Sequence, residues 1–371
     1  VPRTYLSSMK LTTDLENGLA IISVDVAGDP SHGTIRVQAT LEGRVVGSGQ
    51  ARYVGHRAAV VLPLQEVVAW ELGRPTLYDL TLTLDSTGGS HDVVHSYLGL
   101  RSVSWDDRAI LLNGKPVFQR LVLDQGFYPD GIYTAPSDES LRRDIEISQG
   151  LGFNGARLHQ KVFEPRFLYW ADRLGYLVWG EFPNWGLDIS LPQALEVFLP
   201  QWLEAMQRDY NHPSLVGWCP FNETQRDQDA EVLRNVYRTT KALDPSRPVI
   251  DTSGYQHVET DIYDIDNYQQ DPEVFASAFA ALAKGGEPFR NRPDLDAPYQ
   301  GQPYFVSEYG GIWWNPGQQD DEAWGYGGVQ ARPRSEDEFV ARYRALTEAL
   351  LGHPRICAFC YTQLYDIEQE V

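Results

Sequence analysis

The pattern of apolar residues changes near Leu111, where apolar runs begin to alternate with amphipathic segments of helical period. This alternation predicts parallel strands joined by helices. The expected strands begin near Val117, Phe153, Tyr176, Leu215, Pro248, Asp261, Pro303 and Arg355, and the expected helices span 137–150, 164–174, 194–210, 229–243, 272–283 and 335–351. Eight strand–helix units in roughly 260 residues have the size of a (β/α)8 barrel. Because the chain reaches Val371 before an eighth helix, we expect a barrel incomplete at its C-terminus and a natural protein that continues.

The region up to about residue 102 has a different pattern. Runs 20–26, 33–39 and 78–84 alternate apolar and polar residues, with Gly, Pro, Asp and Ser between them. Period-two alternation predicts an antiparallel β-sandwich, and Gly47-Ser48-Gly49 and Gly88-Gly89 are expected to be turns. No polar groups converge here, which favours a scaffold or spacer. The expected domains are therefore 1–102 and 103–371.

The charge balance restricts the partners. The chain has 31 Lys and Arg against 51 Asp and Glu, a formal net charge of -20. Such a chain repels phosphate backbones and anionic lipid, so we expect neither nucleic acid nor a membrane as a partner. No run approaches the roughly 18 apolar residues that span a bilayer. The start at Val1 has no signal-peptide pattern and no initiator Met, which favours a processed or excised piece.

The three cysteines, Cys219, Cys357 and Cys360, lie in apolar runs and are expected to be small buried hydrophobic residues. Cys357 and Cys360 form a C-x-x-C, but no second pair or nearby His cluster completes a zinc site. We therefore expect no metal. An odd number of cysteines without a disulfide framework favours a reducing compartment, so we predict a cytoplasmic protein.

Two glutamates follow apolar runs in the second region. Glu223 ends the run that begins at Leu215, and Glu308 ends the run that begins at Tyr304. In a parallel sheet such residues project at one rim, where barrel enzymes place their active sites. Two carboxyl groups in different environments, one protonated and one ionised, can cleave a glycosidic bond. The alternative is that each is a solvated glutamate at a strand end.

The order of motifs along the chain carries a family resemblance. The run 111–117 enters the first expected barrel strand, and Asn154-Gly155-Ala156-Arg157-Leu158-His159, Asn222-Glu223 and Ser307-Glu308-Tyr309-Gly310 follow it. This arrangement resembles glycoside hydrolase family 2 over essentially the whole chain. The resemblance implies an immunoglobulin-like sandwich before a TIM barrel, without the usual N-terminal jelly-roll domain. It also implies a retaining mechanism without a cofactor, with Glu223 as acid/base and Glu308 as nucleophile.

Four further residues at the expected rim are candidates for binding substrate or orienting the glutamates. Asn222 can donate to a sugar 2-hydroxyl, or it can satisfy backbone at a strand end. Arg157 can hold the nucleophile ionised, while His159 is equally a satisfied structural group. Tyr268 can hydrogen-bond the nucleophile or pack in the core.

Aromatic and acidic residues complete the candidate substrate site. The chain has 10 Trp and 20 Tyr, of which Trp179, Trp185, Trp313, Trp314, Trp324 and Tyr361 lie at or beyond expected strand ends. Sugars stack on such rings, and we select Trp313 and Tyr361, although buried core aromatics are common. Glu181 can bind a hydroxyl or pair with Arg157. Asp124 can receive sugar hydroxyls or lie in an exposed loop.

Departures from the family pattern limit the substrate. Leu123-Asp124-Gln125 stands where many relatives have Asn-Arg-His, and no Asn-x-Lys that would grip a uronate follows Gly311. We therefore predict a retaining exo-glycosidase for a terminal neutral sugar, with a β-galactoside as the default and an L-arabinoside as a variant. The alternative is a carbohydrate-binding or scaffold protein without catalysis. Because a neighbouring subunit completes the pocket mouth in several relatives, the resemblance also admits a homo-oligomer.

Overall fold

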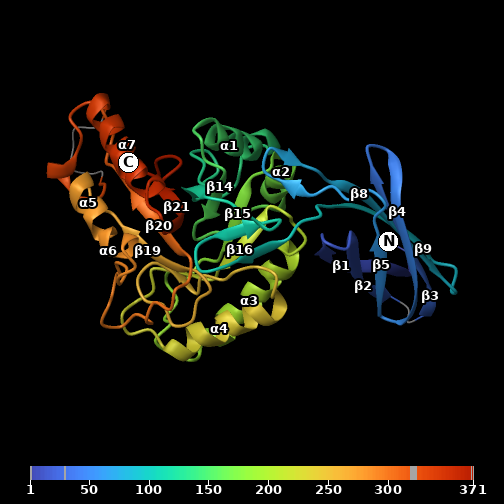
Figure 1. The fold of residues 1–371 in the computed structure, drawn as a ribbon. Helices are drawn as coiled ribbons and strands as arrows, with labels where there is room; N and C mark the ends of the chain where they lie inside the picture. The colour runs from blue at the N-terminus through green and yellow to red at the C-terminus, as the bar shows by residue number, and fades with distance from the viewer. Residues whose placement is uncertain (1, 29–30, 318–323, 369, 371) are drawn as a thin grey trace.

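The structure is a computed structural model that describes residues 2–28, 31–317, 324–368 and 370. It has a β-rich N-terminal region beside a larger region in which strands and helices alternate (Figure 1). The change of architecture falls where the sequence pattern changes. The site discussed below lies in the second region.

The β-rich region is one antiparallel sheet with the strand order β1-β2-β5-β4-β3-β8-β9. The strands are β1 (Thr4–Asp14), β2 (Leu19–Gly28), β3 (Ser31–Leu41), β4 (Arg44–Gly55), β5 (Arg57–Pro63), β8 (Tyr78–Ser86) and β9 (His91–Leu98). Every second residue of β2 and β8 is buried in a shared core, as period-two alternation requires. The edge strands β1 and β9 lie close to each other, as the hydrogen bond from the Leu6 amide to Asp92 Oδ2 at 2.9 Å shows. The assignment to the immunoglobulin type stays a prediction.

The turn predicted at Gly47-Ser48-Gly49 is wrong, because these residues lie inside β4. The two glycines face strand β5 at very short range. A Cβ on Gly47 would lie 2.6 Å from the Pro63 carbonyl oxygen, and one on Gly49 would lie 2.3 Å from that of Val61. The glycines therefore permit close strand packing and do not mark a reversal of the chain. The turn predicted at Gly88-Gly89 is present.

Short strands connect the two regions. They are β6 (Trp70–Glu71), β7 (Arg74–Pro75), β10 (Val103–Trp105), β11 (Ile110–Leu112) and β12 (Lys115–Pro116). Buried Arg101 donates to the carbonyls of Pro213 at 2.9 Å and Leu215 at 2.8 Å, and Trp70 Nε1 donates to the Asp172 carbonyl at 2.7 Å. Because Leu215 is the first residue of its strand, these contacts lie at the end of the strand opposite to the candidate rim.

The second region is built on a curled parallel sheet with the strand order β16-β15-β14-β13-β21-β20-β19. Its strands are β13 (Gln119–Asp124), β14 (Gly155–Leu158), β15 (Leu177–Glu181), β16 (Leu215–Cys219), β19 (Tyr263–Asn267), β20 (Tyr304–Gly310) and β21 (Ile356–Thr362). Each begins within two residues of its expected start. Together with the helices around them, they form the TIM barrel that the sequence pattern predicts.

The strand expected from Pro248 is much shorter than the others. It consists of β18 (Thr252–Ser253), paired with β17 (Phe221–Asn222), and of one parallel bridge between Trp218 and Val249. Pro220 separates β16 from β17 and cannot donate a ladder hydrogen bond, which explains the interruption. On the other side, the Asp261 amide donates to the Val249 carbonyl at 2.9 Å. This irregular side of the barrel carries one of the two candidate glutamates.

Helices cover the outside of the sheet (Figure 1). They are α1 (Asp138–Gly150), α2 (Pro165–Leu174), α3 (Ala194–Asp209), α4 (Ala230–Leu243), α5 (Pro272–Ala278), α6 (Ala280–Ala283) and α7 (Glu336–Leu351), with a short 3₁₀ turn at Val329–Ala331. Side chains of Ser137, Asp229, Asp271 and Ser335 accept from backbone amides and fix four of the starts. The helix expected over 272–283 divides at Phe279, whose amide bonds the Ala276 carbonyl, three residues back.

The three cysteines are buried and free of disulfides, as the sequence predicts. Among the described residues, no helix combines the length and the apolar character that crossing a membrane requires.

Candidate active site

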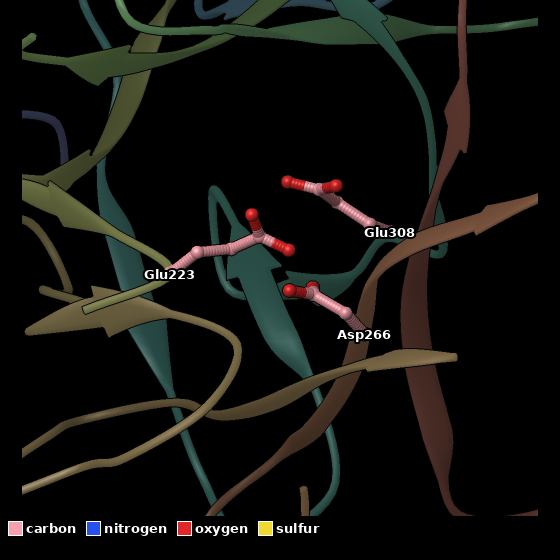
Figure 2. A group of neighbouring side chains, drawn as sticks. All are labelled: Glu223, Asp266 and Glu308. Carbon is pink, nitrogen blue, oxygen red and sulfur yellow. The ribbon is translucent and has the colours of Figure 1, made fainter. Parts of the chain in front are cut away.

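Three carboxyl groups from different strands converge at the carboxyl-terminal rim of the barrel. Glu223 directly follows β17, Asp266 lies in β19, and Glu308 lies in β20. Figure 2 shows their side chains pointing toward one another. One oxygen of each carboxyl lies within 4.8 Å of those of the other two. The structure thus brings together the two glutamates selected from the sequence and adds an aspartate that sequence reasoning missed.

Glu308 is buried, and both of its oxygens accept hydrogen bonds. Arg157 Nη2 donates to Oε1, and the Tyr268 hydroxyl donates to Oε2. The ring of Tyr268 stacks on Tyr326 with centroids 3.3 Å apart, and its hydroxyl also lies 3.0 Å from Thr362 Oγ1. A guanidinium and a phenol on the two oxygens stabilise negative charge on the carboxylate. Glu308 is therefore built to be ionised.

Glu223 has a different environment. Its backbone has φ 45°, which is uncommon for a residue with a side chain, and its amide donates to the Ser253 carbonyl at 2.9 Å. Burial and the neighbouring Glu308 raise the pKa of Glu223 to about 7, although a hydrogen bond from Tyr255 opposes the rise. Glu223 therefore holds a proton up to neutral pH, where an ordinary glutamate has lost it.

Arg157 links Glu308 to two other candidates. Its Nη1 donates to Glu181 Oε2 at 3.0 Å and to Asn222 Oδ1 at 2.9 Å, and the whole side chain is buried. The other oxygen of Glu181 accepts from the Gln160 amide at 2.9 Å and lies 3.2 Å from His159 Nδ1. Of the two roles considered for Glu181, the ion pair with Arg157 is thus the one present.

Asn222 is held from three directions. Its backbone amide donates to Asn184 Oδ1 at 2.8 Å, and its carbonyl accepts from Asn184 Nδ2 at 3.1 Å. Since Arg157 fixes Oδ1, the orientation of the side-chain amide is determined. Within the described part of the chain, buried Nδ2 has no hydrogen-bond partner. Asn222 therefore retains a donor beside Glu223.

His159 and Asp124 are buried close to each other in the fold. The His159 amide donates to the Asp124 carbonyl at 2.8 Å, and the His159 ring meets Trp185 edge-on at 5.3 Å. Asp124 Oδ1 accepts from the Gly126 amide and the Tyr365 hydroxyl, each at 2.8 Å. The alternative of an exposed loop aspartate is wrong, because Asp124 is the last residue of strand β13 and is buried. Burial, with help from Asp144, raises the pKa of Asp124 to about 6.

The two selected aromatic residues have different environments. Tyr361 lines a cavity of about 160 Å³ together with Tyr326 and Thr362. This cavity lies next to the Glu308 contacts because Tyr268 bonds Thr362. Trp313 is buried under the guanidinium of Arg332, 5.0 Å from its ring centre, and its Nε1 has no partner among the residues that the structure describes.

The remaining tryptophans at expected strand ends have different environments, and Trp314 lines the same cavity as Tyr361. Trp179 belongs to the core and donates from Nε1 to Gln119 Oε1 at 2.8 Å, so it does not face a ligand. Trp185 and Trp324 are exposed.

Family models match both regions of the chain. The model described as "Glycosyl hydrolases family 2, TIM barrel domain" matches residues 103–323, and the model described as "Glycosyl hydrolases family 2" matches residues 4–101. The chain belongs to glycoside hydrolase family 2. The resemblance inferred from the motifs is thereby confirmed.

Named relatives carry two different activities. "Beta-galactosidase 2" of Enterobacter cloacae is 30% identical over 286 residues, which are 70% of this family 2 chain and 27% of the relative. "Beta-glucuronidase" of Rattus norvegicus is 28% identical over 277 residues, which are 67% of this chain and 39% of the relative. The chain thus spans well under half the length of these two relatives.

Solved structures of the family share the fold. A β-glucuronidase from Ruminococcus gnavus superposes with a TM-score of 0.79 at 18% identity, covering 100% of this chain and 62% of that one. A β-galacturonidase of family 2 from Eisenbergiella tayi, bound to galacturonate, gives 0.77 at 18% identity, covering 97% and 65%. At this level of identity the superpositions establish the fold.

The residues of this family 2 site that sequence reasoning missed are Asp266, Tyr255, Tyr326, Gln160 and Asn184. One signal pointed to Asp266, because it lies two residues before Tyr268 and alternate strand residues share a face. Tyr255 and Gln160 have φ 63° and 49°, and such backbone has no clear mark in the sequence. Nothing local indicated that Asn184 would hold the backbone of Asn222.

The three converging carboxyls also bear on metal binding. Among the described residues they form a group close enough to hold one cation. A cation there would occupy both glutamates that glycoside cleavage needs in different protonation states. Without a bound cation, the raised pKa of Glu223 means that a proton on this residue relieves part of the repulsion among the three carboxyls.

Proposed function

We propose that the protein is a retaining exo-glycosidase that removes a terminal neutral sugar, with a β-galactoside as the first candidate. The observation that carries the proposal is the opposite environment of two adjacent glutamates. Glu308 receives a guanidinium and a phenol, whereas burial raises the pKa of Glu223 to about 7. One group is thus prepared to attack and the other to donate a proton.

Each residue has a role in a double displacement. Glu223 protonates the glycosidic oxygen while Glu308 attacks the anomeric carbon, which breaks the bond to the aglycone and forms a glycosyl-enzyme ester. Glu223, now ionised, takes a proton from water, and that water displaces Glu308. Asn222 Nδ2 supplies a donor for the sugar 2-hydroxyl.

The spacing of the carboxyls supports retention of configuration. Retaining enzymes place the two groups about 5–5.5 Å apart, and inverting enzymes about 6.5–9.5 Å apart to admit water. Oxygens of Glu223 and Glu308 lie within 4.8 Å of each other, which favours the retaining arrangement.

The charge around the site supports a neutral sugar. Glu223, Asp266 and Glu308 surround the reaction centre, and the guanidinium of Arg157 is already bonded to Glu181, Asn222 and Glu308. A uronate would add a carboxylate to this acidic group, and Arg157 is already committed to the residues around it. This argument favours galactosides over glucuronides, although relatives bear both names.

A panel of nitrophenyl glycosides tests the proposal. The panel contains galactose, glucose, mannose, arabinose and glucuronic acid as pyranosides and furanosides. We expect turnover of a neutral sugar, and NMR should detect first the product anomer that matches the substrate. An inverted first product contradicts the mechanism, and preference for the glucuronide contradicts the substrate. Sugar binding in calorimetry without turnover of any glycoside would favour a carbohydrate-binding protein.

A further inference from the structure

Asp266 is a buried carboxyl that the double displacement does not use. It is 4% exposed, and its Oδ2 has no hydrogen-bond partner in the described residues. The carboxyl group as a whole points toward the two glutamates (Figure 2). Room for Oδ2 is made by Gly254, where φ is 65° and a Cβ would lie 1.8 Å from this oxygen. The fold thus places a third carboxyl against the reacting pair.

Counting hydrogens at Ser307 indicates the protonation state of Asp266. Ser307 Oγ is in hydrogen-bond contact with three acceptors, which are Asp264 Oδ2, Asp266 Oδ1 at 2.9 Å and the Ile265 carbonyl at 3.1 Å. A hydroxyl carries a single hydrogen and can serve one of them fully. A close contact with two carboxyl oxygens is therefore best satisfied when one of the carboxyls brings a hydrogen of its own.

Asp264 is the carboxyl that carries charge. Its Oδ2 accepts from the Gly254 amide at 2.9 Å. His257 Nε2 donates to the Asp264 backbone carbonyl at 2.9 Å and also lies 3.2 Å from Asp264 Oδ1. The other nitrogen of His257 lies 2.7 Å from Asp251 Oδ1. Although burial lowers the pKa of His257, the carboxylates of Asp251 and Asp264 raise it well above the ordinary value. The cationic His257 beside Asp264 and the Gly254 amide on Oδ2 stabilise a charge on Asp264. We therefore assign the carboxyl hydrogen to Asp266.

The charged groups around Asp266 also favour its protonated form. Burial, Glu308, Glu223 and Asp264 raise the pKa of Asp266 well above its ordinary value, and Arg157 is the nearby cation that opposes them. Like charges at this separation in a buried site are not ionised together.

We propose that Asp266 stays protonated through the reaction and is a positioning residue for Glu223 and Glu308. As a neutral acid, Asp266 fills the space beside the two glutamates without adding a charge. Glu223 then carries the proton and Glu308 carries the negative charge. If Asp266 were ionised, its negative charge would repel the carboxylate of Glu308 that is to attack the sugar. The role of Asp266 in turnover rests on the proposed function, but its protonation state does not.

Infrared difference spectroscopy tests the protonation state without relying on turnover. The Glu223→Gln variant removes the carboxyl proton of Glu223, so that this proton cannot contribute to the spectrum. Its spectrum is compared with that of the Glu223→Gln/Asp266→Asn double variant at a pH about one unit above the pKa of Glu223 in the wild type. We expect a band of a protonated carboxyl that the double variant lacks. If the two spectra match in that region, Asp266 is ionised and the proposal is wrong. This result can be read even if the protein cleaves no glycoside.

Kinetics test the positioning role. Asp266→Asn, a neutral group of the same shape, should keep kcat/KM within about threefold and leave the alkaline limb of the pH profile in place. Asp266→Ala should lower kcat by roughly tenfold with little change in KM, because the pair loses its support. A folded Asp266→Asn as poor as Asp266→Ala, or an alkaline limb shifted down by about a unit, shows that the charge is needed and overturns the proposal.

Asp144→Asn is the matched control. This carboxyl is also partly buried and accepts from the Tyr128 hydroxyl at 2.7 Å, but it lies outside the converging group. Its replacement should leave both the spectrum difference assigned to Asp266 and the pH profile unchanged. A clear shift of the alkaline limb in Asp144→Asn would show that buried charge outside the site moves the profile, and would overturn the use of the profile to assign the charge of Asp266.

Discussion

The two sides of the active site are built in different ways. Glu308 lies within the seven-residue strand β20, which pairs with both β19 and β21, and receives donors on both oxygens. Glu223 follows the two-residue strand β17, has φ 45°, and is hydrogen-bonded by the Tyr255 hydroxyl. The ionised group is thus on regular structure and the protonated group on irregular structure.

This difference matches the role that we propose for each group. A nucleophile must keep one charge and one position, which a paired strand and a buried guanidinium provide. An acid/base must release and recover a proton, so its pKa has to lie near the working pH. Burial beside another carboxyl achieves this for Glu223 without a charged partner of its own.

The largest expected effect lies on the Glu308 side. Glu308→Ala should abolish turnover of nitrophenyl glycosides, because no other group can form the glycosyl-enzyme ester. Added azide should restore part of the rate and yield the glycosyl azide of inverted configuration. Circular dichroism should show that the variant is folded. Near-native turnover by folded Glu308→Ala would show that the two sides have been assigned wrongly.

Arg157 carries the next largest effect, because it defines the charged side. Arg157→Met should lower kcat/KM by about 10²-fold or more through the loss of a preorganised charge on Glu308. It should also lower the free energy of unfolding by about 3–5 kcal/mol, since buried Glu181 loses its partner. Urea unfolding measures the second quantity. Arg157→Lys keeps the positive charge and should retain part of the activity and part of the stability. Equal losses in Arg157→Met and Arg157→Lys would count against an electrostatic role of Arg157.

Replacing Glu223 should give an effect that depends on the substrate. Glu223→Ala should lose about 10²–10⁴-fold with poor leaving groups, because their departure needs a proton. Dinitrophenyl glycosides leave without this help, and their first step should be nearly unchanged. A burst followed by slow turnover would locate the remaining loss in the second step. A uniform loss for all leaving groups would remove the distinction between the two sides.

The sequence revealed the regular side more completely than the irregular one. The strand that carries Glu308 and the helices around the barrel follow from apolar periodicity, and Arg157 and Tyr268 stand at predicted strand ends. The environment of Glu223 depends on backbone that periodicity does not encode, including β18 and the positive φ of Tyr255. Asp124 was open to two interpretations because one of its hydrogen-bond partners, Tyr365, lies far away along the chain.

Glycines and carboxyls gave less local information. The segment with Gly47 and Gly49 has the composition of a turn. The close approach of strand β5 explains why these glycines lie within a strand instead. Asp266 shares a sequence run with Tyr268 but gains its environment from Glu223 and Glu308, which come from two other runs. Its protonation depends on Ser307 and Asp264 as well. Such multi-residue environments arise only when the strands are assembled.

The smallest expected effect concerns the hydroxyl of Tyr255, which hydrogen-bonds Glu223. For the wild type, kcat/KM should fall as the pH rises through about 7, because the raised pKa of Glu223 marks the loss of the catalytic proton. The Tyr255 hydrogen bond stabilises ionised Glu223 and lowers that pKa, so Tyr255→Phe should move the alkaline limb upward by a fraction of a unit while kcat changes by less than about tenfold. Tyr326→Phe, on the Glu308 side, is the matched control and should leave the limb in place. A downward shift in Tyr255→Phe would mean that the phenol favours protonated Glu223, and the acid would then owe its proton to Tyr255 as well as to burial.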